Sequence, residues 1–166
     1  VTTVHCIVLY EGDKVISFPP EKIQDGLKLM SKADKLIGHN IIDYDLRVLK
    51  KIYDWDFKGE VFDTLVASRT IWPNLFQLDA EMQKINSNLY GSHALKAWGF
   101  RLGELKGSFN QGSESFEKYS KEMLSYCIQD VKVTSLLYNK ILKKEFSEDA
   151  LKMEHDIHTL LSNQQE

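Results

Sequence analysis

Two short segments place carboxylate side chains where they could bind metal ions. Asn40 and Asp45 follow a short apolar run that ends at His39, and they open a helical pattern. This order puts acidic side chains at the carboxyl end of an expected strand, where open α/β sheets bind their ligands. In the second segment Tyr126 and Asp130 have the i, i+4 spacing, so a helix would carry both on one face.

Hydrolysis of a phosphodiester bond is the chemistry that suits these side chains. Two divalent cations roughly 3.5–4 Å apart can neutralise the charge on the pentacoordinate phosphorus and make a water nucleophilic, if carboxylates hold them. Asp45 and Asp130 are the candidate ligands. Tyr126 stays neutral near physiological pH and is the candidate for orienting the attacking water.

Structural roles are the alternatives for these residues. Asp45 and Asp130 could be surface carboxylates at a helix start and on a polar helix face, and Tyr126 could be a core aromatic residue with a satisfied hydroxyl. The flanking Asn40 and Tyr44 favour the metal-ligand interpretation. The histidines are scattered without clustered ligands, so we expect structural or packing roles at His39 and His93, and packing or solvent exposure at His155 and His158.

Hydrophobic patterning predicts the elements that must position these side chains. Residues 4–10 and 15–18 are rich in β-forming types around a turn-like segment, which predicts an antiparallel hairpin. Strand and helix patterns then alternate, as in an α/β protein. The further expected elements are a helix over 23–32, a strand over 35–40, a helix from Tyr44, a strand from Val61 whose Asp63 caps a helix to Arg69, a loop-rich insertion over 72–89 with a short helix, a helix from Ser92 to Gly99, a polar mobile loop over 107–115, a helix over 116–142, and a last helix from Ser147 or Glu148.

Composition limits the class of protein. The 166 residues, 43% of them hydrophobic, suit one globular domain, and without a signal sequence or a membrane-length apolar run we expect a soluble intracellular protein. A net charge of −3 argues against nonspecific gripping of long duplex DNA, although metals could still bring a strand end to the carboxylates. Cys6 and Cys127 lie in apolar surroundings, which favours buried reduced thiols over a disulfide or a zinc site.

The motifs resemble those of a known family. N-x-x-x-Y-D at residues 40–45 and Y-x-x-x-D at residues 126–130 look like the second and third motifs of the DnaQ-like, DEDD-type 3′–5′ exonucleases, in the subclass with tyrosine in the third motif. V-F-D-T-L-V-A-S-R at 61–69 and G-S-H-A-L-K-A-W-G-F-R-L-G-E-L-K-G at 91–107 resemble stretches of the proofreading domains of bacteriophage family A, Pol I-like DNA polymerases. The similarity covers nearly the whole chain.

This resemblance implies an RNase H-like α/β fold, a mixed sheet flanked by helices. It implies two Mg²⁺ or Mn²⁺ ions, a single-stranded DNA 3′ end as substrate, nucleoside 5′-monophosphates as products, and work in the bacterial cytoplasm during infection. Asp45 would bind a metal directly or through water, and Asp130 would bind the catalytic metal. Tyr126 would position the water, and Asn40 would help to hold the substrate end.

One departure concerns the family's first motif, D-x-E, which lies on a central first strand upstream of the position matching Val1 and supplies two metal ligands. The D-x-E at residues 79–81 follows no apolar strand, so we expect a decoy on a solvated segment. We therefore expect residues 1–146 to form an exonuclease domain without its first strand, and residues 147–166 a helix leading toward a polymerase domain. Both ends resemble cuts, and the fragment itself should be weakly active or inactive.

Two alternatives remain open. A degenerate, non-catalytic relative serving as a scaffold or single-strand-binding module would explain the absent first motif. An RNA-trimming nuclease of the same superfamily would use the same chemistry, although the polymerase-like stretches argue against it.

Overall fold

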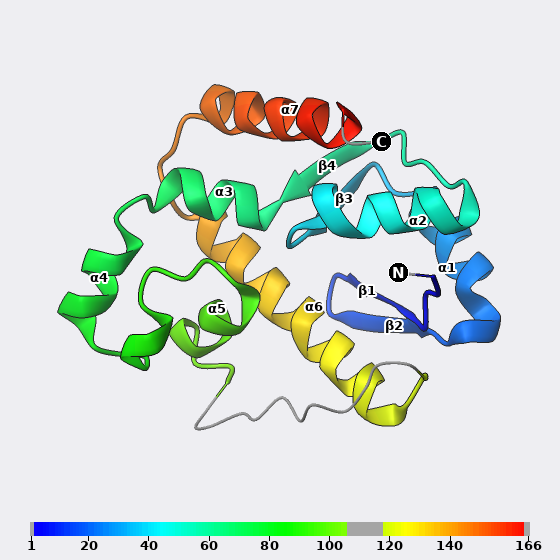
Figure 1. The fold of residues 1–166 in the computed structure, drawn as a ribbon, viewed down its shortest axis with the longest axis horizontal. Helices are drawn as coiled ribbons and strands as arrows, with labels where there is room; N and C mark the ends of the chain where they lie inside the picture. Colours follow the sequence, from blue (N-terminus) through cyan, green and yellow to red (C-terminus); the bar gives the residue numbers. More distant parts are fainter. Residues whose placement is uncertain (1, 106–117, 165–166) are drawn as a thin grey trace.

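Two small sheets form the strand framework of the protein. The computed structural model describes residues 2–105 and 118–164. β1 (Ile7–Glu11) pairs antiparallel with β2 (Lys14–Phe18), and β3 (Lys35–Gly38) pairs parallel with β4 (Glu60–Asp63). The predicted hairpin and both later strands are confirmed, and the chain has a mixed α/β architecture (Figure 1).

Helices surround these sheets in the order that the sequence predicts (Figure 1). The described helices are α1 (Ile23–Met30), α2 (Leu46–Tyr53), α3 (Thr64–Ile71), α4 (Leu75–Met82), α5 (Leu95–Arg101), α6 (Lys121–Leu142) and α7 (Glu148–Gln164), with short turns at Pro20–Lys22 (η1), Ile41–Asp45 (η2, a π-helical turn) and Ser87–Leu89 (η3). None of the helices in the described part of the chain is long and apolar enough to span a lipid bilayer.

The hairpin turn shows why the first two strands pair. Glu11 and Lys14 are partners in the register, so Gly12 and Asp13 make a two-residue loop. Gly12 has a φ of 59°, which residues with a side chain rarely adopt. The glycine therefore lets the chain reverse within two residues.

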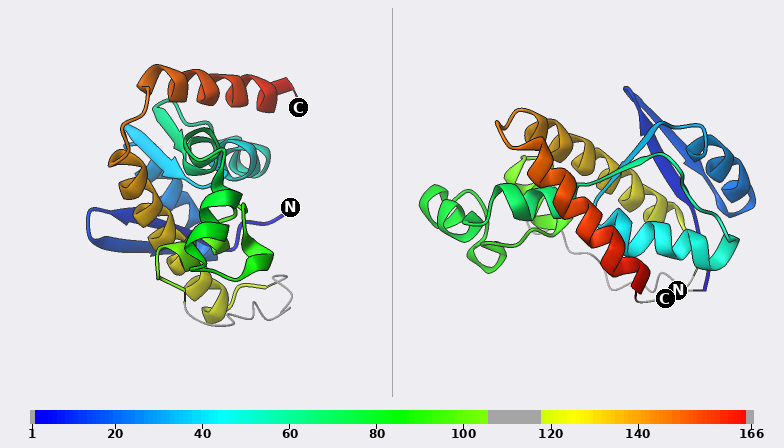
Figure 2. Two further views of the ribbon diagram at one scale, coloured as in Figure 1. Left: turned by 90° about the vertical axis from the view of Figure 1, so that its left-hand side faces the viewer. Right: turned by 90° about the horizontal axis from the view of Figure 1, so that it is seen from above.

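α6 links the two sheets. It contacts both β1 and β3, and its carboxyl half buries Val133, Leu137 and Ile141 in a cluster with Trp72 and Trp98. A second cluster lies around α1, the hairpin and β3, with α2 packed against it. Figure 1 shows α6 running diagonally past both strand pairs, and Figure 2 shows α7 lying along α3, a helix that it contacts. The position of α6 therefore decides how the two strand pairs lie relative to each other.

The ends of two helices differ from the prediction. α5 begins at Leu95, not after Ser92, and it continues past Gly99. A side chain at Gly99 would come within 2.6 Å of the Leu105 side chain, so this glycine permits close packing and does not end the helix. Gly103, with a φ of 73°, stands just beyond the helix end instead.

The amino end of α6 also lies later than predicted. The helix begins at Lys121, because the Ser120 hydroxyl accepts the Met123 amide as an N-cap. The mobile loop expected over 107–115 and the first residues of the expected helix lie outside the described residues.

The insertion contains a buried ion pair where we expected a solvated segment. The Asp79 carboxylate accepts hydrogen bonds from Arg101 Nε at 2.9 Å, Arg101 Nη2 at 2.7 Å and the Gly91 amide at 2.8 Å. Burial acts to raise the pKa of Asp79, but the bonds from Arg101 and Gly91 outweigh it and hold the pKa below its usual value. The D-x-E at 79–81 therefore begins with a carboxylate that fastens α4 to α5.

The Asp79–Arg101 ion pair should contribute strongly to the free energy of unfolding. Both side chains are less than a tenth exposed, so Arg101→Met would leave a buried carboxylate without its cation. We expect this variant to lose about 3 kcal/mol or more of unfolding free energy in urea denaturation. Asp79→Leu combined with Arg101→Met should recover part of the loss, because it removes the unpaired carboxylate while the Gly91 amide and the Ser92 carbonyl still lose their partners. A loss below about 1 kcal/mol in Arg101→Met would contradict this account.

Candidate functional site

Asp63 organises the region around the candidate site. Its side chain is 1% exposed and stands at the carboxyl end of β4. The carboxylate accepts the amides of Leu65 and Val66 at 2.9 and 3.4 Å, which confirms the predicted cap of α3. It also accepts the amides of Asn40 and Ile42 at 2.9 and 3.1 Å. One carboxylate therefore fixes both the start of α3 and the turn after β3, and only the first of these was predicted.

Asn40 lies at the entry of the π-helical turn η2. It has a φ of 61° and a ψ of 26°, a left-handed conformation that asparagine tolerates better than most residues. Its backbone amide is held by Asp63. The left-handed conformation is a structural reason for asparagine at this position, and its role in substrate binding stays a prediction. π-Helical turns occur frequently at functional sites.

Asp45 is the last residue of η2 and keeps contact with solvent. Removal of part of its hydration by surrounding protein atoms, together with the negative charge of Asp63, raises its pKa to about 6 against an opposing backbone hydrogen bond. A bound cation would favour the ionised form of this carboxyl group.

Tyr126 and Asp130 lie one turn apart on α6, as the sequence predicts. Tyr126 is half-buried, and Asp130 reaches solvent although partial burial raises its pKa. The charges of Asp45 and Asp130 both act on the Cys127 thiol. Its pKa is raised first by the hydrogen bond with Cys6 and by burial, and further by the negative charges of both Asp130 and Asp45. The fold thus brings the two candidate ligands, from η2 and α6, within electrostatic reach of one side chain.

The donor set matches part of what hard divalent cations need. Asp45 and Asp130 offer carboxylate oxygens, the ligands that Mg²⁺ and Mn²⁺ prefer. Within residues 2–105 and 118–164, no group of three or more histidine, cysteine or acidic side chains is arranged to hold a metal ion. The two aspartates therefore fit as a partial site, and their metal-binding role stays a prediction.

His155 has a specific structural role. It is buried, as expected for a packing residue, and the Asp63 backbone amide donates to its Nε2 at 2.8 Å. Since Nε2 accepts, the ring proton lies on Nδ1, which donates to the Leu151 carbonyl at 2.7 Å. This contact docks α7 on the end of β4. Sequence reasoning missed it, because no local pattern relates the two residues.

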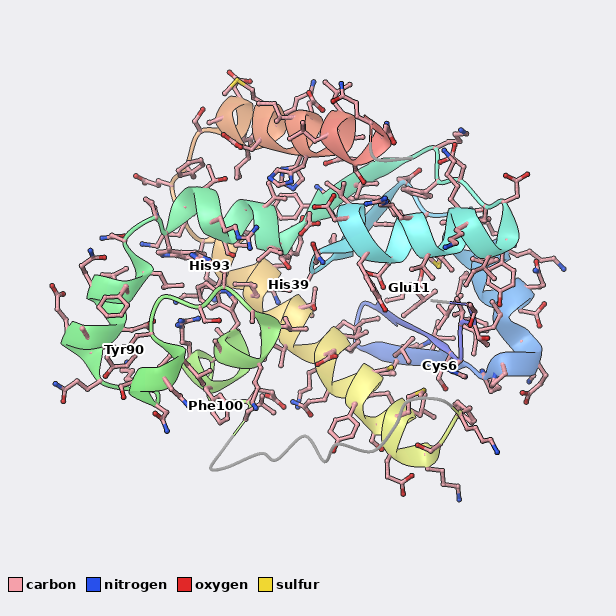
Figure 3. The ribbon with its side chains drawn as sticks, in the orientation of Figure 1. Cys6, Glu11, His39, Tyr90, His93 and Phe100 are labelled. Carbon is pink, nitrogen blue, oxygen red and sulfur yellow. The ribbon has the colours of Figure 1, made fainter. Side chains whose placement is uncertain are left out.

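His39 and His93 both lie beside α3 (Figure 3). Thr64 Oγ1 donates to the Gly38 carbonyl, so His39 Nδ1–H must donate to Thr64 Oγ1, at 2.9 Å. His39 Nε2 is buried without a hydrogen-bond partner among the described residues. Burial is the largest cause that lowers the pKa of His39, to about 4, so the ring is neutral near physiological pH. Its interactions are those of a structural residue, as predicted.

The two cysteines differ from the prediction of buried thiols. Both are half-buried, and their sulfur atoms are 3.6 Å apart. The surroundings of each cysteine in the sequence are apolar, but the contact between them depends on the packing of α6 against β1.

A hollow between α3 and α7 contains none of the candidate residues. It is lined by Val66, Arg69, Thr70, Pro73, Glu154 and His158. The candidate chemistry therefore lies outside this hollow, on η2 and α6.

Comparison with known proteins decides which class the chain resembles. No protein-family model matches it. It is 33% identical to the DNA-directed DNA polymerase of Escherichia phage T7 over 172 aligned positions, which cover 86% of this chain and 24% of that polymerase. The DNA-directed DNA polymerase of Enterobacteria phage T3 is 34% identical over the same shares of both chains.

The chain is similar to one region of phage DNA polymerases. It spans about a quarter of the length of these relatives. The resemblance to phage polymerases is confirmed at this level, whereas the names of these relatives do not address the exonuclease assignment.

Replacing Asp63 should unfold the region that carries the site. Asp63→Ala removes the acceptor of four backbone amides, and buried amides without partners are costly. We expect a loss on the order of 3–5 kcal/mol in denaturant unfolding, and a smaller loss for Asp63→Asn, which keeps one carbonyl acceptor. The exposed Asp156→Ala on α7 is the control, with a change within about 0.5 kcal/mol. An Asp63→Ala loss no larger than that of the control would contradict this role.

The neutral state of His39 should make stability depend on pH. Its folded pKa is lowered to about 4, so between that pH and its ordinary value near 6.5 the unfolded chain binds more protons than the folded one. Stability from this residue is therefore lost as the pH falls from 7 toward 4, by about 1 kcal/mol between pH 7 and 5 after allowance for partial solvent exposure. His39→Asn keeps a donor to Thr64 and should remove this part of the pH dependence. The measurement is urea unfolding of both proteins across this range, and identical slopes against pH would contradict the prediction.

Proposed function

We propose that this chain is part of the 3′–5′ proofreading exonuclease domain of a DNA polymerase. The observation that carries the proposal is the packing of α6, which carries Tyr126 and Asp130, against β3, whose carboxyl end leads into η2 with Asn40 and Asp45. Similarity to a region of two phage DNA polymerases supports a polymerase as the parent. Residues 1–146 would be the exonuclease portion, and residues 147–166 would lead toward the polymerase domain.

The arrangement of the strands supports an RNase H-like fold for the intact domain. Within the described residues β1 pairs with β2 alone and β3 with β4 alone, while α6 contacts both β1 and β3. A further strand between β1 and β3 would join the two pairs into one mixed five-stranded sheet. We propose that this strand, preceding β1 in the parent chain, carries D-x-E and supplies the other two metal ligands.

Each candidate residue has a distinct part in the proposed reaction. Bound Mg²⁺ or Mn²⁺ ions supply charge neutralisation at the phosphate and activation of a water. Asp130 and Asp45 would hold these ions through carboxylate oxygens, and Tyr126 would orient the attacking water. Asn40 would hold the 3′-terminal nucleotide near the turn. The raised pKa of each aspartate fits this assignment, because groups with perturbed pKa values cluster at functional sites.

The helix α7 supports a polymerase domain as an intramolecular partner. Its outer face exposes apolar side chains at helical spacing, and Leu160 is 64% exposed. The exposed members of this face are Met153, Ile157, Leu160 and Leu161. Exposed apolar patches of this kind often mark interfaces. We propose that the polymerase domain of the parent chain covers this face.

A non-catalytic scaffold or single-strand-binding module is the second candidate. It is favoured by the presence of two acidic side chains, not three, in the candidate site of the described residues. An RNA-trimming nuclease would use the same groups, but the similarity to DNA-directed DNA polymerases favours a DNA substrate. Single-stranded RNA in place of DNA in the assay below separates these two substrates.

The decisive assay joins this chain to its upstream strand. We expect Mg²⁺-dependent release of nucleoside 5′-monophosphates from single-stranded DNA, falling about 100-fold or more in Asp130→Ala and Asp45→Ala because each removes metal-binding oxygens. Tyr126→Phe should reduce the rate less, since water retains other means of positioning. Asp43→Ala is the matched control, an exposed carboxylate in the same turn that should keep full activity.

Two outcomes would contradict the exonuclease assignment. Undiminished activity in Asp130→Ala would exclude it as a metal ligand, and single-strand binding without hydrolysis by the extended protein would favour the scaffold. For residues 1–166 alone we expect weak or absent activity. Tight binding of two Mn²⁺ ions to this chain in calorimetry would show that its ligand set is larger than proposed.

A further inference from the structure

The two cysteines of the chain meet from distant parts of the sequence. Cys6 lies on the segment before β1 and Cys127 on α6, and their sulfur atoms are 3.6 Å apart across 121 positions (Cys6 is labelled in Figure 3). The packing of α6 against β1 holds both backbones in place. At this distance the sulfurs are in contact, with no side chain between them.

We propose that Cys6 and Cys127 are a redox-active dithiol that closes reversibly to an intramolecular disulfide on reaction with a small-molecule disulfide such as oxidised glutathione. A disulfide requires the sulfurs to approach to about 2.05 Å. We expect side-chain rotation to supply this approach, because the elements that carry the two residues are already packed together.

The two thiols differ in pKa, and thiol–disulfide exchange needs one thiol that ionises readily. Hydrogen bonding with Cys127 lowers the pKa of Cys6 to about 7 against the opposing effect of burial, so a substantial fraction of Cys6 is thiolate near physiological pH. Cys127 has a raised pKa and stays protonated until its partner has reacted. Both side chains are half-buried, so a small reagent can reach them from solvent.

The exchange runs in two balanced steps. The Cys6 thiolate attacks one sulfur of the reagent, whose S–S bond breaks, and one glutathione thiolate leaves. Cys127 then gives up its proton to solvent, its sulfur attacks the Cys6 sulfur, and the second glutathione leaves. The protein loses two electrons and two protons, and oxidised glutathione is reduced to two glutathione thiols.

The bond would tie the segment before β1 to the turn of α6 that carries Tyr126 and Asp130. Any effect of oxidation on nuclease activity rests on the proposed function. Formation of the disulfide does not, because it depends on the two sulfurs alone. Thiol chemistry is therefore the primary readout, and its failure is distinguishable from failure of the exonuclease assignment.

The test treats the full chain with oxidised glutathione and measures intact mass and free thiols. We expect a monomer lighter by two hydrogen atoms, a fall from two free thiols to none, and a single peptide pair linking Cys6 to Cys127 after proteolysis. Dithiothreitol should restore both thiols. The wild-type protein should keep no glutathione adduct, because the second cysteine displaces the glutathione bound to the first.

Two serine variants are the matched controls. Cys127→Ser and Cys6→Ser each keep one thiol and should each accumulate one glutathione adduct, faster when Cys6 is the thiol that remains. Wild-type protein that carries two glutathiones, forms covalent dimers or stays unmodified would overturn the proposal. This wild-type result stands even if a serine variant folds poorly.

Discussion

The buried carboxylate of Asp63 is the interaction on which the rest of the candidate site depends. Its oxygens accept amides from the start of η2 and from the start of α3, while its own backbone amide donates to His155 of α7. A buried carboxylate is costly unless hydrogen bonds satisfy it. Here the same bonds also satisfy backbone groups that would otherwise be orphaned at a strand end and a helix start. Three elements therefore meet at the carboxyl end of β4.

This arrangement carries an electrostatic consequence for the neighbouring acid. Asp45 ends the turn that Asp63 anchors, so its position follows from that anchor, and the negative charge of Asp63 contributes to its raised pKa. The folded protein thus holds one carboxylate where ionisation is disfavoured. Partial loss of hydration is the larger cause of the raised pKa of Asp45, and the charge of Asp63 adds to it.

α6 supplies the second half of the site and joins it to the first. Its carboxyl half is fastened by Leu137 and Val133 in the cluster around Trp98, while its amino half carries Tyr126 and Asp130 past β1 and β3. The helix is therefore anchored at one end and carries the candidate residues Tyr126 and Asp130 toward the other. The contact between Cys6 and Cys127 arises at this functional end, where the segment before β1 meets the helix.

The sequence by itself determined the local features: the hairpin around Gly12, the cap at Asp63, and the placement of the two acidic motifs after a strand and on a helix. These follow from backbone preferences and periodicity, which act over a few residues. Only the tertiary structure decided the pairings of Asp79 with Arg101 and of Asp63 with His155, along with the contact between the cysteines. The role of Gly99 was also decided by the tertiary structure. A local pattern cannot tell a glycine that ends a helix from one that lets another side chain pack closely against it. Each of these depends on which distant surfaces meet, and that is set by the packing of whole helices against the two sheets, not by any spacing along the chain.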